Sequence, residues 1–201
     1  MSSIVIKANK QEPSASQGEL SKPLFVAIPL HPSVLNMLTF FAENNESLNI
    51  RWIPERNYHI TLLYLGRINP EAIPAVQSSL SNCIKTIPPF ILSFREISVI
   101  QNKGREKMIW AKFHENEDFT SASHKILDAL VSQVQINVSF KKPIPHVTLS
   151  RLKRSADLNR MNVTIPEGDL TIVVKHCELW ESNKSDTGTY YKRIGSFNLA
   201  D

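Results

Sequence analysis

The chain has 201 residues, enough for one well-filled hydrophobic core or for two small lobes that share one. Its net charge of +4 and pI of about 9.1 suit a polyanionic substrate, but fall short of the dense basic stripe of a dedicated duplex-DNA binder. No apolar run approaches the length of a membrane-spanning helix. Cys83 and Cys177 lack metal-binding spacing and are typical of reduced thiols in a cytoplasmic protein, and a single disulfide is the alternative.

The first predicted elements are a strand and a helix behind a polar N-terminus. Residues 1–21 lack the apolar core of a signal peptide and are predicted to form a flexible extension. The apolar run at 24–30 has the length of a strand. Pro32 then opens a helix that ends at Asn44, because apolar residues recur on one helical face: Val34, Leu35, Leu38, Phe41 and Ala42.

The middle of the chain continues with extended segments and a second helix. Asn69 suits an N-cap and Pro70 suits the first helical position. The pattern predicts, in chain order, extended segments at 48–52 and 58–65, a helix at 70–84, and a β-hairpin of strands 90–100 and 108–113 around a turn at 102–105.

The second half repeats the order strand, helix, extended segment, strand. After the strand at 108–113 the pattern predicts a helix near 119–134, an extended segment at 136–140, a strand at 145–151, and a last hairpin of 169–181 with 189–199 around a polar loop at 182–188. The repeat predicts an α+β fold: residues 22–201 form one bilobal domain in which two mostly antiparallel sheets face each other across a central cleft, with helices on the outer faces.

One short motif occurs twice, at the same place in each half. His59-x-Thr61 and His146-x-Thr148 are each followed by an apolar residue, and the two histidines are 87 residues apart. Because side chains alternate along a strand, each histidine shares a face with its threonine. Facing lobes would bring both motifs to one substrate.

Two imidazoles suit acid–base catalysis at a phosphodiester. One neutral imidazole accepts a proton from water, while one imidazolium donates a proton to the leaving alkoxide. Thr61, Thr148 and Arg151 would bind the non-bridging oxygens of the phosphate. Arg151 lies five residues beyond His146, and this odd offset places it on the opposite face of a regular strand unless a β-bulge re-aims it.

A metal-dependent site is the competing reading of two strand-borne histidines. Zinc sites use three or four protein ligands, and neither motif supplies the usual neighbouring ligand, so the sequence predicts no metal and no cofactor. Nor does it contain a nucleophile elbow or a glycine-rich phosphate loop. Three tryptophans are predicted to pack in the core, with base stacking as the alternative: Trp52, Trp110 and Trp180. Phe25 fits the cleft and the core equally well.

The doubled motif resembles that of the two-histidine (2H) phosphoesterase superfamily. Within it, the segments 51–66 and 145–151 are similar to those of the bacterial and archaeal RNA 2′,3′-cyclic phosphodiesterases, once called 2′-5′ RNA ligases. The first strand and the last hairpin are similar too, so the likeness covers about residues 22–199. The chain departs from the family pattern in its longer N-terminal tail, and in Arg56 and Tyr58 before the first motif.

The resemblance implies a bilobal fold and metal-free opening of a 2′,3′-cyclic phosphate at an RNA end to a 2′-phosphate, with weak reversible 2′-5′ ligation of tRNA halves. It implies that His59 and His146 are catalytic, that Thr61 and Thr148 complete the two motifs, and that Arg151 binds phosphate. The expected partners are RNA ends or nucleoside 2′,3′-cyclic phosphates, and the protein is expected to be a cytoplasmic monomer without membrane contact.

Two other functions fit the same residues. One is a phosphodiesterase for 2′-5′-linked oligonucleotides, and the other is a nucleotide- or RNA-binding module of the same fold without turnover. The presence of both histidines, both threonines and Arg151 argues against a pure binding module, because binding needs no matched acid and base. Basic residues on both flanks of the second motif favour contact with an RNA backbone.

Overall fold

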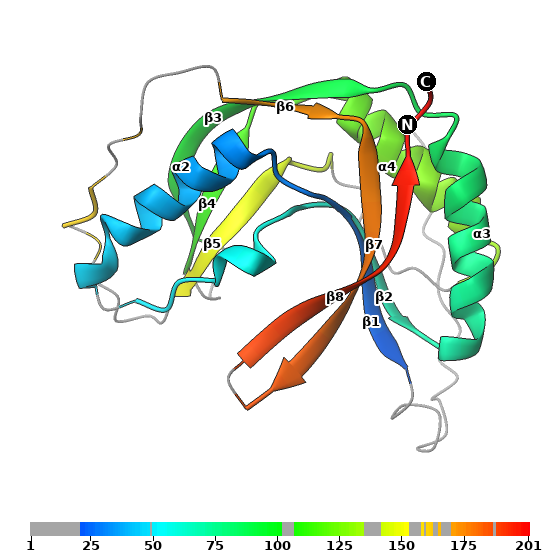
Figure 1. Cartoon of the computed structure of the whole chain (residues 1–201), viewed down its shortest axis with the longest axis horizontal. Helices are drawn as coiled ribbons and strands as arrows, with labels where there is room; N and C mark the ends of the chain where they lie inside the picture. The colour runs from blue at the N-terminus through cyan, green and yellow to red at the C-terminus, as the bar shows by residue number, and fades with distance from the viewer. Residues whose placement is uncertain are drawn as a thin grey trace, which may run out of the picture.

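The computed structural model describes residues 21–48, 50–101, 107–134, 142–152, 158, 160–162, 165, 170–186 and 188–201 (Figure 1). Its strands are β1 (Lys22–Ile28), β2 (Ile60–Ile68), β3 (Phe90–Gln101), β4 (Lys107–Phe113), β5 (His146–Leu152), β6 (Thr171–Val174), β7 (His176–Ser185) and β8 (Gly188–Asn198). Its helices are α2 (Pro32–Glu43), α3 (Ile73–Ile84) and α4 (Glu117–Leu130). Short 3-10 turns lie at Glu46–Leu48, Glu55–Asn57 and Pro70–Ala72.

The helices begin where polar side chains cap them. The His31 ring accepts a hydrogen bond from the Ser33 backbone N–H, and α2 starts at Pro32 as the sequence predicts. Asn116 Oδ1 accepts from the Phe119 N–H at 2.7 Å, so α4 starts at Glu117 rather than near Phe119. The N-cap predicted at Asn69 belongs to the 3-10 turn, after which α3 begins at Ile73.

One sequence expectation is wrong and another is met only in part. In the segment 48–52, expected to be extended, Leu48 ends a 3-10 turn and Trp52 makes an isolated bridge to Ser150. The polar loop expected at 182–188 is mostly strand, because β7 runs to Ser185 and β8 starts at Gly188, whose positive φ of 128° suits a glycine. The expectations for residues 1–20, the turn at 102–105 and the segment 136–140 lie outside the described residues. Cys83 and Cys177 are free thiols.

The strands form one curled sheet in the order β6-β3-β4-β5-β2-β1-β7-β8, and every pairing is antiparallel (Figure 1). The α+β class is therefore confirmed. The two expected sheets appear as two four-stranded halves, which meet between β5 and β2. Only one residue pair, Ile60 with Val147, is in register at this junction, so the halves are joined by a very short ladder.

The junction shows how the repeat is arranged in space. Ile60 and Val147 are 87 residues apart, the same spacing as between the two histidines. When equivalent residues of two antiparallel strands pair with each other, a local two-fold axis passes between them. The two copies of the motif are therefore related by a pseudo-two-fold axis at the centre of the sheet.

Helices of each half pack on strands of the other half. Phe41 of α2 contacts Trp52 edge-on, and Trp52 bridges to Ser150 of β5. In return α4 packs on β2 and α3, and α3 contacts β8. Figure 1 shows α2 with β3, β4 and β5, and α3 with α4 at the other half. Buried residues of both halves consequently belong to one continuous hydrophobic cluster.

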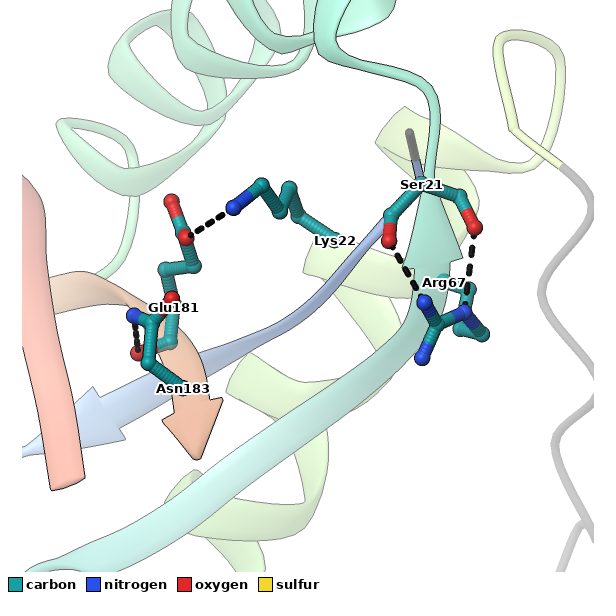
Figure 2. A network of polar contacts seen from close by, with 5 residues as sticks. All are labelled: Ser21, Lys22, Arg67, Glu181 and Asn183. Atoms are coloured by element: carbon teal, nitrogen blue, oxygen red, sulfur yellow. Dashed lines mark hydrogen bonds and ion pairs between the residues drawn. The ribbon is translucent and has the colours of Figure 1, made fainter. Parts of the chain in front are cut away.

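The start of β1 is held from both sides (Figure 2). Arg67 of β2 donates from Nε to Ser21 Oγ at 3.0 Å and from a terminal nitrogen to the Ser21 carbonyl at 2.8 Å. On the other side, Lys22 forms an ion pair of 3.1 Å with Glu181 of β7. These contacts fix the N-terminal end of a strand that lies between β2 and β7 and carries Phe25 toward the site described next.

Candidate active site

The two His-x-Thr motifs meet at the junction of the halves. Ile60 and Val147 are fully buried against the helices, so the residues on either side of them point to the opposite face of the sheet. We call this the open face. On it His59 and His146 are diagonal neighbours, a position in which Cα atoms lie about 7–8 Å apart. The structure thus brings both motifs together.

Each histidine is oriented by a backbone carbonyl two residues upstream. His59 Nδ1 lies 2.7 Å from the Asn57 carbonyl oxygen, and His146 Nδ1 lies 2.7 Å from the Ile144 carbonyl oxygen. Because a carbonyl only accepts, Nδ1 carries the hydrogen in both rings, and the neutral imidazole has its lone pair on Nε2. The hydroxyl of Thr61 lies 3.1 Å from His59 Nε2 and can donate to it.

Arg151 reaches the open face because β5 contains a bulge. Thr148 lies opposite Trp110, whereas Ser150 lies opposite Ile109, so Leu149 is an extra residue in the ladder. Ser150 is fully buried and Arg151 is exposed, which puts Arg151 on the side of His146 and Thr148. The bulge that the odd offset required is therefore present.

The first motif has the same local geometry. In β2 the ladder with β1 skips Leu62, and the residue five places after His59 is Tyr64, opposite Phe25. Tyr64 is exposed on the open face. The pseudo-two-fold axis therefore relates an aromatic side chain, Tyr64, to the guanidinium of Arg151.

Three aromatic rings surround His59, and the sequence patterns did not predict this arrangement. The ring centroids of Phe25, Trp180 and Tyr191 lie 4.8, 5.1 and 5.1 Å from that of His59. They come from β1, β7 and β8. Trp180 was expected in the core: it is nearly buried, but it packs with Phe25 on the open face, apart from the main hydrophobic cluster.

A buried carboxylate fixes Trp180. Glu178 is 6% exposed; its Oε2 accepts from Trp180 Nε1 at 2.6 Å, and its Oε1 receives Arg193 at 3.1 Å. Because Glu178 and Trp180 are two residues apart on one strand, they share the open face. Glu178 thereby holds the indole against His59.

Glu178→Ala should lower the free energy of unfolding by about 1–3 kcal/mol, because the indole N–H loses its acceptor in a buried place. Urea denaturation measures this change. Glu178→Gln keeps an acceptor and should lose less. Glu115→Ala removes an exposed ion pair with Lys142 and should leave stability almost unchanged. Equal losses for Glu178→Ala and Glu115→Ala would contradict the role given to the buried carboxylate.

His146 has different neighbours. The Trp110 ring stacks on it with a centroid separation of 3.7 Å and an interplanar angle of 20°. Lys112 lies directly opposite His146 in the β4–β5 ladder. The two imidazoles of the pair therefore lie in unlike surroundings, one enclosed by aromatic rings and one next to a cation.

Among the described residues, no cluster of three or more histidine, cysteine, aspartate or glutamate side chains is placed to hold a metal ion. The described helices are also too short or too polar to span a bilayer.

Comparison with known proteins agrees with the fold and the motifs. The model of a family described as LigT-like phosphoesterase matches residues 30–110. A Bacillus subtilis relative named RNA 2′,3′-cyclic phosphodiesterase is 23% identical over 88% of this chain and 96% of its own length. An Archaeoglobus fulgidus relative of the same name is 26% identical, over 87% and 98%. The chain is therefore similar to LigT-like phosphoesterases.

Solved structures of the LigT-like phosphoesterase fold superpose on most of the chain. E. coli LigT in its apo form gives a TM-score of 0.70 at 20% identity, covering 90% of this chain and 99% of LigT. A Thermus thermophilus protein gives 0.76 at 23% identity, covering 88% and 97%. These likenesses establish the shared fold.

Both histidines are poised to be neutral in the ligand-free protein. Burial lowers the pKa of His59 to about 4; the hydrogen bond to the Asn57 carbonyl opposes this lowering in part, and the charge of His146 adds a smaller one. Burial also lowers the pKa of His146, and the nearby Lys112 lowers it further. Because each imidazolium disfavours the other, the site takes up one proton more readily than two.

These pKa values predict that the ligand-free protein loses stability in mild acid. Below about pH 6.5 the unfolded chain binds more protons than the folded one, because the folded pKa of His59 is near 4. The loss therefore begins near pH 6.5 and continues to about pH 4. Between pH 7 and pH 5 we expect the free energy of unfolding to fall by roughly 2 kcal/mol more in the wild type than in His59→Gln, measured by urea denaturation. Parallel curves would contradict the burial of this imidazole.

Proposed function

We propose that the protein is a metal-independent RNA 2′,3′-cyclic phosphodiesterase, which opens cyclic phosphate ends to 2′-phosphates. The observation that carries the proposal is the meeting of two imidazoles at the pseudo-two-fold axis, each with Nδ1 bound to a carbonyl and Nε2 left for proton transfer. The names of the relatives, which span most of the chain, support the substrate class.

In this proposal the phosphate lies between the two histidines. Arg151 and the hydroxyls of Thr61 and Thr148 bind its non-bridging oxygens and stabilise the charge that grows on them. Water attacks phosphorus and passes a proton to one Nε2. The P–O3′ bond breaks on the opposite side, and the other imidazolium donates a proton to O3′. The product retains the P–O2′ bond.

The roles of the two histidines are assigned as His59 the acid and His146 the base. Burial among aromatic rings disfavours the imidazolium of His59, so that this ring is a strong proton donor once it is protonated. The bound phosphate carries a negative charge, which raises the pKa of an imidazole beside it and so allows His59 to be protonated.

Reversible 2′-5′ ligation of RNA ends, including tRNA halves, is the second candidate activity. A 5′-hydroxyl in the place of water would attack the same phosphorus, with the same base and the same acid, and would leave a 2′-5′ phosphodiester. The reverse of that reaction cleaves 2′-5′-linked oligonucleotides. The protein is proposed to act as a monomer in the cytoplasm.

One assay tests the proposed function. The protein is incubated with EDTA and, side by side, a nucleoside 2′,3′-cyclic phosphate, a 2′-5′-linked dinucleotide and a 3′-5′-linked dinucleotide. We expect the cyclic phosphate to be opened to the 2′-phosphate, with a bell-shaped dependence of rate on pH. Activity lost in EDTA and restored by zinc or manganese would indicate a metal enzyme. Binding without turnover of any substrate would indicate a binding module.

Arg151→Ala should raise KM and lower kcat together, because the guanidinium binds the phosphate in the ground state and more strongly in the transition state. Steady-state kinetics on a nucleoside 2′,3′-cyclic phosphate measures both constants. Arg67→Ala is the matched control, since Arg67 binds Ser21 at the far end of β2. An Arg151→Ala variant with the kinetics of Arg67→Ala would remove Arg151 from the site.

A further inference from the structure

Lys112 is the charged side chain directly across the β4–β5 ladder from His146. Residues directly opposite each other in an antiparallel pair point to the same face, with Cβ atoms about 4.5–5.5 Å apart. The side chain of Lys112 is only 22% exposed, against 52% for Lys142 on the surface. A partly buried cation thus lies beside one of the two imidazoles.

Glu96 holds the ammonium in place. It lies opposite Lys112 in the next ladder, between β3 and β4, and its Oε1 is 3.3 Å from Lys112 Nζ. Arg95 Nε lies 3.9 Å from the same oxygen. Glu96, Lys112 and His146 therefore form one row across three strands of the open face.

Among the described residues, the other half carries no cation at the equivalent position. Ile28 of β1 lies opposite Ile60, so the position beside His59 on β1 falls to the next residue, Pro29. The described ring neighbours of His59 are Phe25, Trp180 and Tyr191. A pair of motifs that the pseudo-two-fold axis makes equivalent thus differs in charge at one place.

We infer that Lys112, oriented by Glu96, is a positioning residue whose charge opposes protonation of His146, the base of the pair, an inference that rests on the proposed function. The charged groups that face His146 are Lys112 from β4, with Glu96 behind it, His59 from beside β2, and Arg151 further along β5. Burial lowers the pKa of His146 most, and the permanent charge of Lys112 lowers it further, whereas His59 carries charge only when protonated.

The test titrates the His146 imidazole by NMR in the full-length protein, and needs no turnover. Lys112→Met should raise the pKa of His146 by roughly 0.5–1, whereas Lys112→Arg keeps the charge and should leave it near the wild-type value. Glu96→Gln removes the negative charge that offsets the ammonium of Lys112, and should therefore lower the pKa of His146. The two neutralising variants therefore move it in opposite directions, which a general loosening of the sheet would not do.

Kinetics then connects the charge to the base. In Lys112→Met the acidic limb of the kcat/KM profile should move to higher pH by the amount that the NMR titration gives, and Lys112→Arg should restore it. A His146 pKa unchanged in Lys112→Met overturns the inference. A rise in KM in Lys112→Met with an unchanged acidic limb also overturns the inference, and would make Lys112 a direct phosphate ligand. Failure of the wild type to open cyclic phosphates would defeat the proposed function, while the titrations would still decide whether Lys112 controls His146.

Discussion

Replacing His59 or His146 with alanine should lower kcat on a nucleoside 2′,3′-cyclic phosphate by at least about a hundredfold, the usual size of one acid–base contribution. Each imidazole handles a different proton, so neither can replace the other. Because both act on one phosphorus, the double variant should lose much less than the product of the two single losses. Single-turnover kinetics with product separation measures the chemical step directly.

His124→Ala is the matched control, because this histidine is exposed on α4, away from the junction. Circular dichroism should show the same folded content in all three variants. A loss of less than about threefold in either catalytic variant would show that no proton transfer depends on that ring, and would leave the motif a structural feature of the strand.

His59→Ala should be largely rescued by a substrate with an activated leaving group at O3′, whereas His146→Ala should not. A leaving group of low pKa departs without a proton, so the missing acid no longer limits the reaction. Attack by water still needs a base, and His146 supplies it. The measurement is the ratio of kcat/KM values on the activated and natural substrates, for the wild type and both variants.

The opposite pattern would exchange the two roles and leave the rest of the proposed function intact. It would also contradict the inference about Lys112, which makes His146 the base. Rescue of both variants would mean that water attack needs no side-chain base. Rescue of neither would mean that P–O3′ cleavage does not limit the natural reaction.

Local patterns predicted most elements of the fold. The strand at 24–30, the helix from Pro32 and the strand with His146 follow from periodicity and caps, which act within a few residues. The extended segment expected at 48–52 is met in part, at Trp52, which bridges to Ser150; the local pattern did not predict this bridge because pairing partners are remote in sequence. Because strand partners are remote in sequence, local patterns also did not predict that the two halves join into one sheet.

Four of the predicted site residues could be named from the repeat, and Arg151 from its place after the second motif, but their surroundings could not. Arg151 shares a face with His146 because Leu149 forms a β-bulge, and the bulge is visible only in the register of β5 with β4. The sequence predicted Trp110 and Trp180 to pack in the core, because a tryptophan in an apolar stretch gives the same pattern on either face of a sheet. Glu178 gave no signal at all, since its partners Trp180 and Arg193 define its role.

The pseudo-two-fold axis relates the two halves of the chain as the subunits of an isologous dimer are related, with one surface meeting its own copy. The crossing of α2 and α4 to opposite halves resembles the exchange of elements between swapped subunits. Two identical chains must place the same side chain at both ends of such an axis. Joining the copies in one chain removes that constraint, and the ends then differ: Arg151 corresponds to Tyr64, and Lys112 to Pro29. The proposed reaction requires this difference, because the entering oxygen must lose a proton and the departing oxygen must gain one.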